Sequence, residues 1–525
     1  MLRGLAAARR VLLPVRRPGS GGPGAPWSPP SRGSRWRLGP VGLGLALTAA
    51  AAAAAVGSEE EREGPRAEKG FARAVASSRD LLQRLKDEVG APGIVAGVSV
   101  DGKEIWLEGM GYADVENRVL CKPETVLRIA SISKPLTMVA VAKLWEEGKL
   151  DLDAPVQKYV PEFPEKEYEG EKVTITTRLL TSQLSGIRHY EKDISKVKEE
   201  KEKANRTLKA TKDITTSDRE KEDKVSEKTD FAKAKPEHEG KPSKSEKKKT
   251  EFEHKEYYLK EKFDNVIDSL NLFKNDPLFF KPGSQFLYST HGFTLLSAVV
   301  ERASGQKFTD YMLKIFSDLD MLATGLDDNE PLIYNRARNY IHNKKGRLVN
   351  APYVDNSYKW AGGGFLSTVS DLLKFGNAML YGYQLGQLEN LAAGLLPGYL
   401  KPGTVAMMWR PVPNTKAPGD KDVKYGMAWS VVENKQEYGY CRRQRHYAYH
   451  TGGAVGASSV LLILPEESDS AASNSGPLVP PKGVVVTIIC NMQSVSLSSI
   501  ALKIAMEFEQ DKLAQHTVKS SSLQD

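Results

Sequence analysis

Cysteine is scarce in this chain of 525 residues. There are three, Cys121, Cys441 and Cys490, and no two of them form a Cys-x-x-Cys pair. This spacing excludes a disulfide-rich scaffold and a zinc-finger pattern, because both need closely spaced cysteines. Three is an odd number, so at least one thiol has no partner within the chain, and we expect all three to be small buried apolar residues.

Acidic residues are missing from the first 58 positions, which carry eight arginines. Those eight charges equal the net charge of +8 of the whole chain, so the remainder is balanced. A nucleic-acid-binding protein would carry its positive charge as a patch on the folded body. The charge distribution therefore argues against a nucleic-acid partner.

Long apolar runs are also lacking near the N-terminus. The alanine-rich segment Val41–Val56 is shorter than the about 20 residues that a spanning helix needs. It follows an arginine-rich stretch, residues 1–38, that contains serine and proline but no acid, which is typical of a mitochondrial presequence. We predict a presequence over residues 1–58, with a sorting segment at 41–56 that directs the body to the intermembrane space. A transient or peripheral association with the inner membrane stays open, and a secretory signal is the alternative.

Charged residues dominate residues 191–262, where both signs are mixed and apolar residues are sparse. Such a segment cannot bury enough surface to offset its chain entropy. We predict a disordered or loosely helical insertion, with a charged recognition arm as the functional alternative.

The remaining segments predict an α+β fold. Residues 59–90 would form a linker and the first helix, and residues 91–190 and 263–515 a catalytic domain, followed by a tail at 516–525. Strand-like segments lie near both ends of the domain and helical patterns lie between them. This order predicts one antiparallel sheet built from both termini, flanked by helices, beside a helical subdomain.

Ser131 and Lys134 form a Ser-x-x-Lys motif at the start of a predicted amphipathic helix. Residues three apart on a helix share one face, so the amine would lie beside the hydroxyl. A neutral lysine there could make the serine nucleophilic, and the positive helix end would stabilise a developing oxyanion. The motif alone is weak, since the charged tract repeats it at Ser195/Lys198 and Ser245/Lys248.

Two later segments appear in the order that a serine acyl-enzyme would use. Tyr288 precedes a second predicted helix, where its phenol could relay a proton to the leaving group. His450-Thr451-Gly452-Gly453 begins a late strand, and its glycines would let a substrate lie against the strand while an N–H faces the oxyanion.

With these motifs the chain resembles the serine β-lactamase family, in its class C and penicillin-binding-protein-like esterase and peptidase branch. The matching segments include TVLRIASISKPL, FLYSTHGF and HTGGAVGASSVLLILPE. The resemblance implies a β-lactamase/transpeptidase-like fold with no metal or cofactor. It implies Ser131 as nucleophile, Lys134 as base and Tyr288 as second acid/base group. The N–H groups of Ser131 and Gly453 would form the oxyanion hole.

The sequence departs from the family at two site positions. Thr290 stands where many members carry asparagine, and His450 replaces the usual lysine. Because histidine is titratable, His450 would hold a substrate carboxylate by charge only at lower pH. These changes favour a peptide or ester substrate over an antibiotic.

We therefore predict a mitochondrial serine hydrolase, a peptidase acting on peptides or proteins. The resemblance also implies a role in mitochondrial lipid metabolism and assembly into homo-oligomers or filaments. A non-catalytic filament-forming scaffold on a retained fold and a small-ester hydrolase are the alternatives.

Overall fold

The computed structural model describes residues 66–67, 69–193, 195–196, 199, 255–388, 395–416, 422–436, 443–466 and 480–521. Contacts between residues divide the chain after Glu63 into two units, and all described residues belong to the second. The predicted presequence and its apolar segment lie outside the described residues, as do Cys441 and most of the charged insertion. None of the described helices is long and apolar enough to span a membrane.

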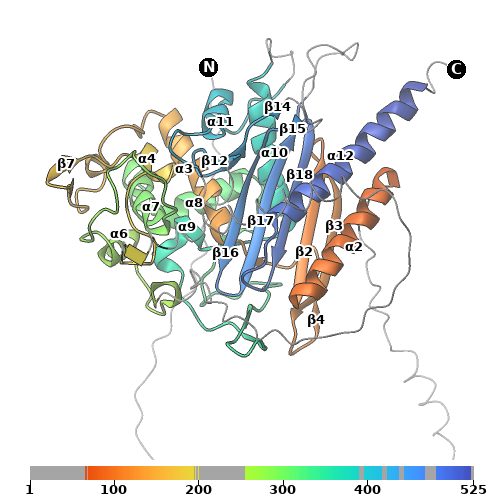
Figure 1. Ribbon diagram of the computed structural model, residues 1–525, viewed down its shortest axis with the longest axis horizontal. Helices are drawn as coiled ribbons and strands as arrows, with labels where there is room; N and C mark the ends of the chain where they lie inside the picture. Colours follow the sequence, from red (N-terminus) through yellow and green to blue (C-terminus); the bar gives the residue numbers. More distant parts are fainter. Residues whose placement is uncertain are drawn as a thin grey trace, which may run out of the picture. The chain divides into compact units, whose positions relative to one another are not determined.

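A nine-stranded antiparallel sheet joins the two ends of the chain (Figure 1). Its order is β1 (Arg66–Ala67), β3 (Lys103–Asp114), β2 (Gly93–Val100), β18 (Gly483–Cys490), β17 (Ala457–Pro465), β16 (Tyr447–Ala454), β13 (Ser430–Val432) and β12 (Val423–Tyr425), with β4 (Val119–Leu120) beside β3. N-terminal β2 pairs directly with C-terminal β18. The predicted sheet built from both termini is therefore confirmed.

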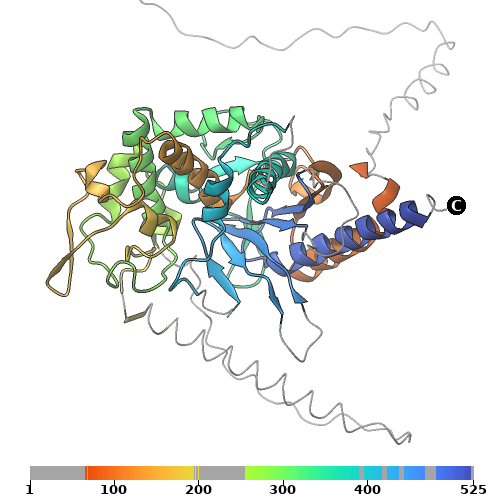
Figure 2. The same cartoon turned by 90° about the horizontal axis from the view of Figure 1, so that it is seen from above.

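Two helices from opposite ends of the chain cover one face of the sheet. These are α2 (Ala72–Val89) and α12 (Ser498–Ser521), which lie side by side in Figures 1 and 2. Phe508 of α12 is fully buried and stacks on Phe71 and Trp106, with ring centroids 5.8 and 6.1 Å apart. The other face packs against α10 (Val369–Leu385). Because both faces are covered, the central strands are continuous apolar runs rather than alternating ones.

The helical region lies between the strands in sequence. It comprises α3 (Ser133–Glu146), α4 (Thr177–Thr181), α6 (Val266–Ser269), α7 (Thr290–Ser304), α8 (Phe308–Asp318), α9 (Trp360–Gly363) and α11 (Pro402–Met408). The prediction that α3 is amphipathic was wrong: Ser133–Ala142 is buried at every position. Since α3 packs against α7, α8 and α9, it has no water-facing side over that length.

Short strands form the remaining sheets. They are β5 (Leu127–Arg128), β11 (Phe365–Ser367) and β8 (Gly325–Leu326) in one sheet, and the pairs β6 (Lys166–Tyr168) with β7 (Glu171–Val173), β9 (Tyr340–His342) with β10 (Leu348–Asn350), and β14 (Lys435–Gln436) with β15 (Arg443–Gln444). The first of these sheets matters for the site, because β5 leads directly to Ser131.

The predicted insertion ends earlier than expected. Residues 255–262 were assigned to it, but Lys255–Tyr258 forms a 3₁₀ turn in which Tyr257 is buried. The buried aromatic ring and the ion pairs of Glu256 outweigh the local charge density that suggested disorder. Cys121 and Cys490 are free and buried, as expected, and burial raises the pKa of each thiol to about 12.

Candidate active site

Ser131 lies in a 3₁₀ turn, Ala130–Ile132, that runs directly into α3. Its predecessor Ala130 has φ = 48°, in the left-handed region that side chains rarely adopt. Ser133 Oγ donates to Ala130 O at 2.6 Å, and Ser459 Oγ donates to Ile129 O at 2.7 Å. These contacts hold the backbone just before Ser131 in a strained turn, which is where functional residues are often found.

Lys134 is fully buried one helical turn after Ser131. Its Nζ lies 3.2 Å from Ser131 Oγ, 2.6 Å from Gly362 O and 3.5 Å from Thr290 Oγ1. The Ser-x-x-Lys spacing therefore brings the amine to the hydroxyl, and α9 and α7 supply the other two oxygens.

Tyr288 precedes α7 and is half-buried over the same amine. Lys134 Nζ lies 4.5 Å from the centroid of its ring, so the ring face meets the ammonium. The centroid of the Tyr288 ring also lies 5.9 Å from that of His189, which meets it edge-on, and 6.2 Å from that of His450. Ser289 caps α7 by accepting from Gly292 N, which fixes the backbone beside Tyr288 and Thr290.

Strand β16 brings the His-Thr-Gly-Gly segment to the same place. The structure shows why position 452 is a glycine, for a reason that the sequence did not suggest. A β-carbon built there would lie 2.4 Å from Ile129 O and 3.0 Å from the Ala130 β-carbon. Glycine at this position therefore lets the strand approach the turn that carries Ser131, while Thr451 and Gly453 are exposed beside it.

His450 is buried and neutral, contrary to the expected charge at lower pH. Burial and the neighbouring Lys134 charge lower its pKa to about 3. Its Nδ1 donates to Thr451 O at 2.7 Å, because a carbonyl can only accept, and Nε2 then accepts from the Tyr425 hydroxyl at 3.0 Å. His450 is uncharged throughout the physiological pH range, so it provides no positive charge to bind a substrate carboxylate.

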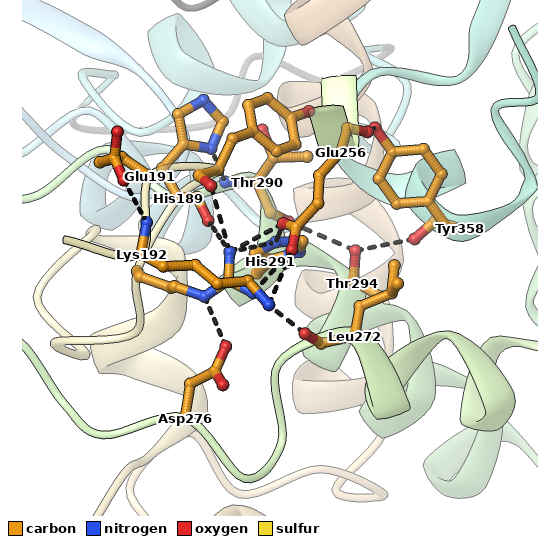
Figure 3. Close-up of polar contacts among 12 residues, drawn as sticks. His189, Glu191, Lys192, Glu256, Leu272, Asp276, Thr290, His291, Thr294 and Tyr358 are labelled. Atoms are coloured by element: carbon orange, nitrogen blue, oxygen red, sulfur yellow. Dashed lines mark hydrogen bonds and ion pairs between the residues drawn. The ribbon is translucent and has the colours of Figure 1, made fainter. Parts of the chain in front are cut away.

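A buried ionic cluster that the sequence analysis missed adjoins the site (Figure 3). Arg188 is 1% exposed and donates to Glu256, at 2.7 and 2.9 Å, and to Asp276 at 2.5 Å. His291 Nε2 lies 2.9 Å from Glu256 Oε2. Burial opposes the charge of Glu256, but hydrogen bonds from His291 and Arg188 lower its pKa to about 2. Burial lowers the pKa of His291 to about 4.

The cluster joins the two ends of the charged insertion. Arg188 lies just before the insertion and Glu256 just after its undescribed part. Neither residue belongs to a motif, and 68 positions separate them, so no local pattern could have paired them. The only signal was the apolar and aromatic content of residues 257–259, which is unusual for that tract.

A groove elsewhere on the molecule does not include the predicted site residues, and the described residues contain no candidate metal site. A groove of about 750 Å³ is lined by residues such as Leu313, Leu322 and Leu332 and includes none of the predicted site residues. Among the described residues, no group of histidine, cysteine, aspartate and glutamate could hold a metal ion.

Comparison with known proteins decides the family. The profile of the beta-lactamase family matches residues 78–222 and 242–501. The chain belongs to the beta-lactamase family. The serine beta-lactamase-like protein LACTB, mitochondrial, of Homo sapiens is 71% identical over 452 residues, covering 85% of this chain and 82% of the human protein. The Mus musculus protein of the same name is 71% identical over 458 residues, with the same coverage of both chains.

Solved structures of this beta-lactamase fold resemble the described body. EstCE1, a hydrolase with promiscuous acyltransferase activity, matches with a TM-score of 0.57 at 18% identity, over 83% of this chain and 98% of its own. A class C beta-lactamase matches with a TM-score of 0.53 at 16% identity, over 84% and 96%. The octameric penicillin-binding protein homologue from Pyrococcus abyssi gives 0.55 at 21%, over 84% and 77%. These likenesses confirm the predicted β-lactamase/transpeptidase-like α+β fold.

Proposed function

We propose that this protein is a serine hydrolase that forms an acyl-enzyme on Ser131. The observation that carries the proposal is the 3.2 Å approach of Nζ of the fully buried Lys134 to Oγ of the half-buried Ser131. In its neutral form Lys134 takes the hydroxyl proton as Oγ bonds to the substrate carbonyl carbon. The N–H groups of Ser131 and Gly453 receive the negative charge that develops on the carbonyl oxygen.

Breakdown of this intermediate requires a proton for the leaving group. Lys134 holds that proton beside the ring of Tyr288, so one of the two returns it as the bond to the leaving nitrogen or oxygen breaks. A water then attacks the acyl carbon. The same pair takes the water's proton and delivers it to Ser131 Oγ as the bond between Oγ and the acyl carbon breaks. Thr290 Oγ1 and Gly362 O hold the amine in place between the two steps.

The substrate class and setting remain part of the proposal. We assign a peptidase that acts on peptides or proteins in the mitochondrial intermembrane space, in support of lipid metabolism. The mitochondrial relatives support the compartment, and the octameric homologue supports self-association into oligomers. Filaments are proposed on the family resemblance alone. A small-ester hydrolase and a non-catalytic scaffold are the competing functions.

Turnover of matched substrates tests the function. A chromogenic ester and a peptide anilide are offered to the wild type, Ser131→Ala and Lys134→Ala. We expect no turnover by Ser131→Ala and a loss of about 10²–10⁴-fold in Lys134→Ala, since a positioned base contributes that much. Ser195→Ala is the matched control, because Ser195 stands in a second Ser-x-x-Lys motif. This variant should retain full activity.

Each other outcome selects a competitor. Turnover of the ester without cleavage of any peptide supports the small-ester hydrolase. If wild type turns over neither substrate, and Ser131→Ala assembles like wild type, the scaffold replaces the hydrolase.

A further inference from the structure

Among the described strands, none pairs with β16 beyond Tyr449 on the side away from β17, so this edge of β16 is open beside Ser131. Its partner β13 extends only to the pair Tyr449↔Ser430, whereas β17 continues to Ala454↔Ala457. Residues of an antiparallel strand alternate, one directing both its N–H and C=O to one neighbour and the next directing both to the other. Tyr449 faces β13, so Thr451 and Gly453 face the same side, past the end of β13. Substrate that lies along this edge would meet their backbone groups.

Both carbonyls on that edge already accept a hydrogen bond from a side chain. His450 Nδ1 donates to Thr451 O at 2.7 Å. The Tyr257 hydroxyl donates to Gly453 O at 3.2 Å. The N–H groups of the same two residues point to the same edge. The edge therefore offers donors, and its acceptors are engaged.

Tyr257 is firmly held in this contact. It is 1% exposed, its ring meets Tyr190 edge-on at 5.3 Å, and Lys359 Nζ lies 4.7 Å from its centroid. The preceding residue, Glu256, is fixed by the buried ionic cluster of Figure 3 and by the Tyr358 hydroxyl, which donates to Glu256 O at 2.8 Å. Because these contacts hold Tyr257 and the residue before it, the Tyr257 hydroxyl binds Gly453 O at little cost in side-chain entropy.

We propose that Tyr257 determines the acyl-group specificity of the site. By engaging Gly453 O it removes the advantage that a peptide acyl residue would gain by donating its own N–H to that carbonyl. The proposed peptidase therefore does not select its acyl group by strand pairing with β16. The favoured acyl group presents an acceptor oxygen, such as a keto or carboxyl oxygen, to the N–H of Thr451, because the N–H of Gly453 belongs to the oxyanion hole. This inference rests on the proposed function, because it concerns the group transferred to Ser131.

Two isosteric esters test the inference on the full chain. The p-nitrophenyl esters of N-benzoylglycine and of 4-oxo-4-phenylbutanoic acid differ only in an N–H replaced by CH₂. Acylation rates are taken from the p-nitrophenol burst, each divided by the alkaline hydrolysis rate of its ester. We expect wild type to show no preference for the N–H ester. Tyr257→Phe frees the carbonyl and should raise the N–H/CH₂ ratio about three- to tenfold, the value of one hydrogen bond.

Tyr258→Phe is the matched control, as it removes a hydroxyl one residue away and should leave the ratio at the wild-type value. A wild-type preference of tenfold for the N–H ester overturns the inference without any variant. An unchanged ratio in Tyr257→Phe, with both esters still giving a burst, overturns it as well and leaves the proposed function standing. No burst from wild type with either ester overturns the proposed function and this inference together.

Discussion

Ser131 and Lys134 lie together because three residues at a helix start nearly complete one turn, which is a local property. Their pairing could therefore be predicted from spacing alone. Gly362 O could not, since 228 positions separate it from Lys134 and only the folded chain brings α9 to α3. The same limit applied to His450, where the residue type suggested a titratable clamp. Its burial beside Lys134 depends on the whole pocket and keeps it neutral.

His450 makes a specific contribution to stability as a function of pH. The unfolded chain takes up a proton on this residue below about pH 6.5, whereas the folded chain does so only near pH 3. Stability therefore falls as the pH drops through that interval, because the unfolded state binds more protons. In His450→Gln the slope of unfolding free energy against pH, measured by denaturant titration between pH 5 and 6, should fall by about one proton.

The slope isolates the titration from any packing change, which would shift the whole curve without tilting it. An unchanged slope in His450→Gln would show that this histidine is protonated in the folded protein. The pH profile of acylation between pH 5 and 8 should likewise keep its shape in the variant.

At the scale of elements, the sequence predicted α2, α7 and the late strand that begins near His450, since each has a clear period or cap. The periodicity of α3 was misjudged because a helix buried on all sides has no polar stripe to measure. Strands β12 and β13 are joined by a turn at Ala428, whose φ is 62°. Nothing in its residue type signals that turn.

The contact between β16 and the Ser131 turn gives a prediction at this scale. A β-carbon at Gly452 would overlap Ile129 O, so Gly452→Ala must push the strand away from the turn. We expect acylation of Ser131 to fall at least about tenfold, by misalignment of the reacting groups, while the secondary structure by circular dichroism is retained.

Gly363→Ala is the control for this change. Its β-carbon would meet the Ala130 backbone at 3.8 Å, an ordinary contact, so its acylation rate should be near wild type. Equal rates in Gly452→Ala and wild type would mean that the close approach of β16 has no part in the chemistry.

At the scale of the whole molecule, the central sheet could be predicted because strands cluster at both ends of the chain and one sheet is the simplest way to bury them. The ion pair between Arg188 and Glu256 in the buried ionic cluster could not be predicted, because the sequence gives no sign that charged residues at the edge of a charged tract are buried. The described residues on the two sides of the insertion are therefore joined by this ion pair next to the site.

Phe508 of α12 packs between the N- and C-terminal segments and is therefore important for the stability of the folded body. Phe508 fills the space between Phe71 and Trp106, so Phe508→Ala leaves a cavity between the N- and C-terminal segments. We expect a loss of about 3–5 kcal/mol in the free energy of unfolding, measured by urea denaturation. Met506→Ala on the same helix, where the side chain is 47% exposed, should cost far less. Similar losses in both variants would argue against a common core for the termini.

The activated nucleophile is the central claim, and the intact mass of the protein after a serine-directed acylating probe tests it most directly. Wild type, Ser131→Ala and Lys134→Ala are treated in parallel. The account predicts one adduct in wild type, none in Ser131→Ala and slow addition in Lys134→Ala. The absence of an adduct from folded wild type, or an adduct that persists in Ser131→Ala, would contradict it.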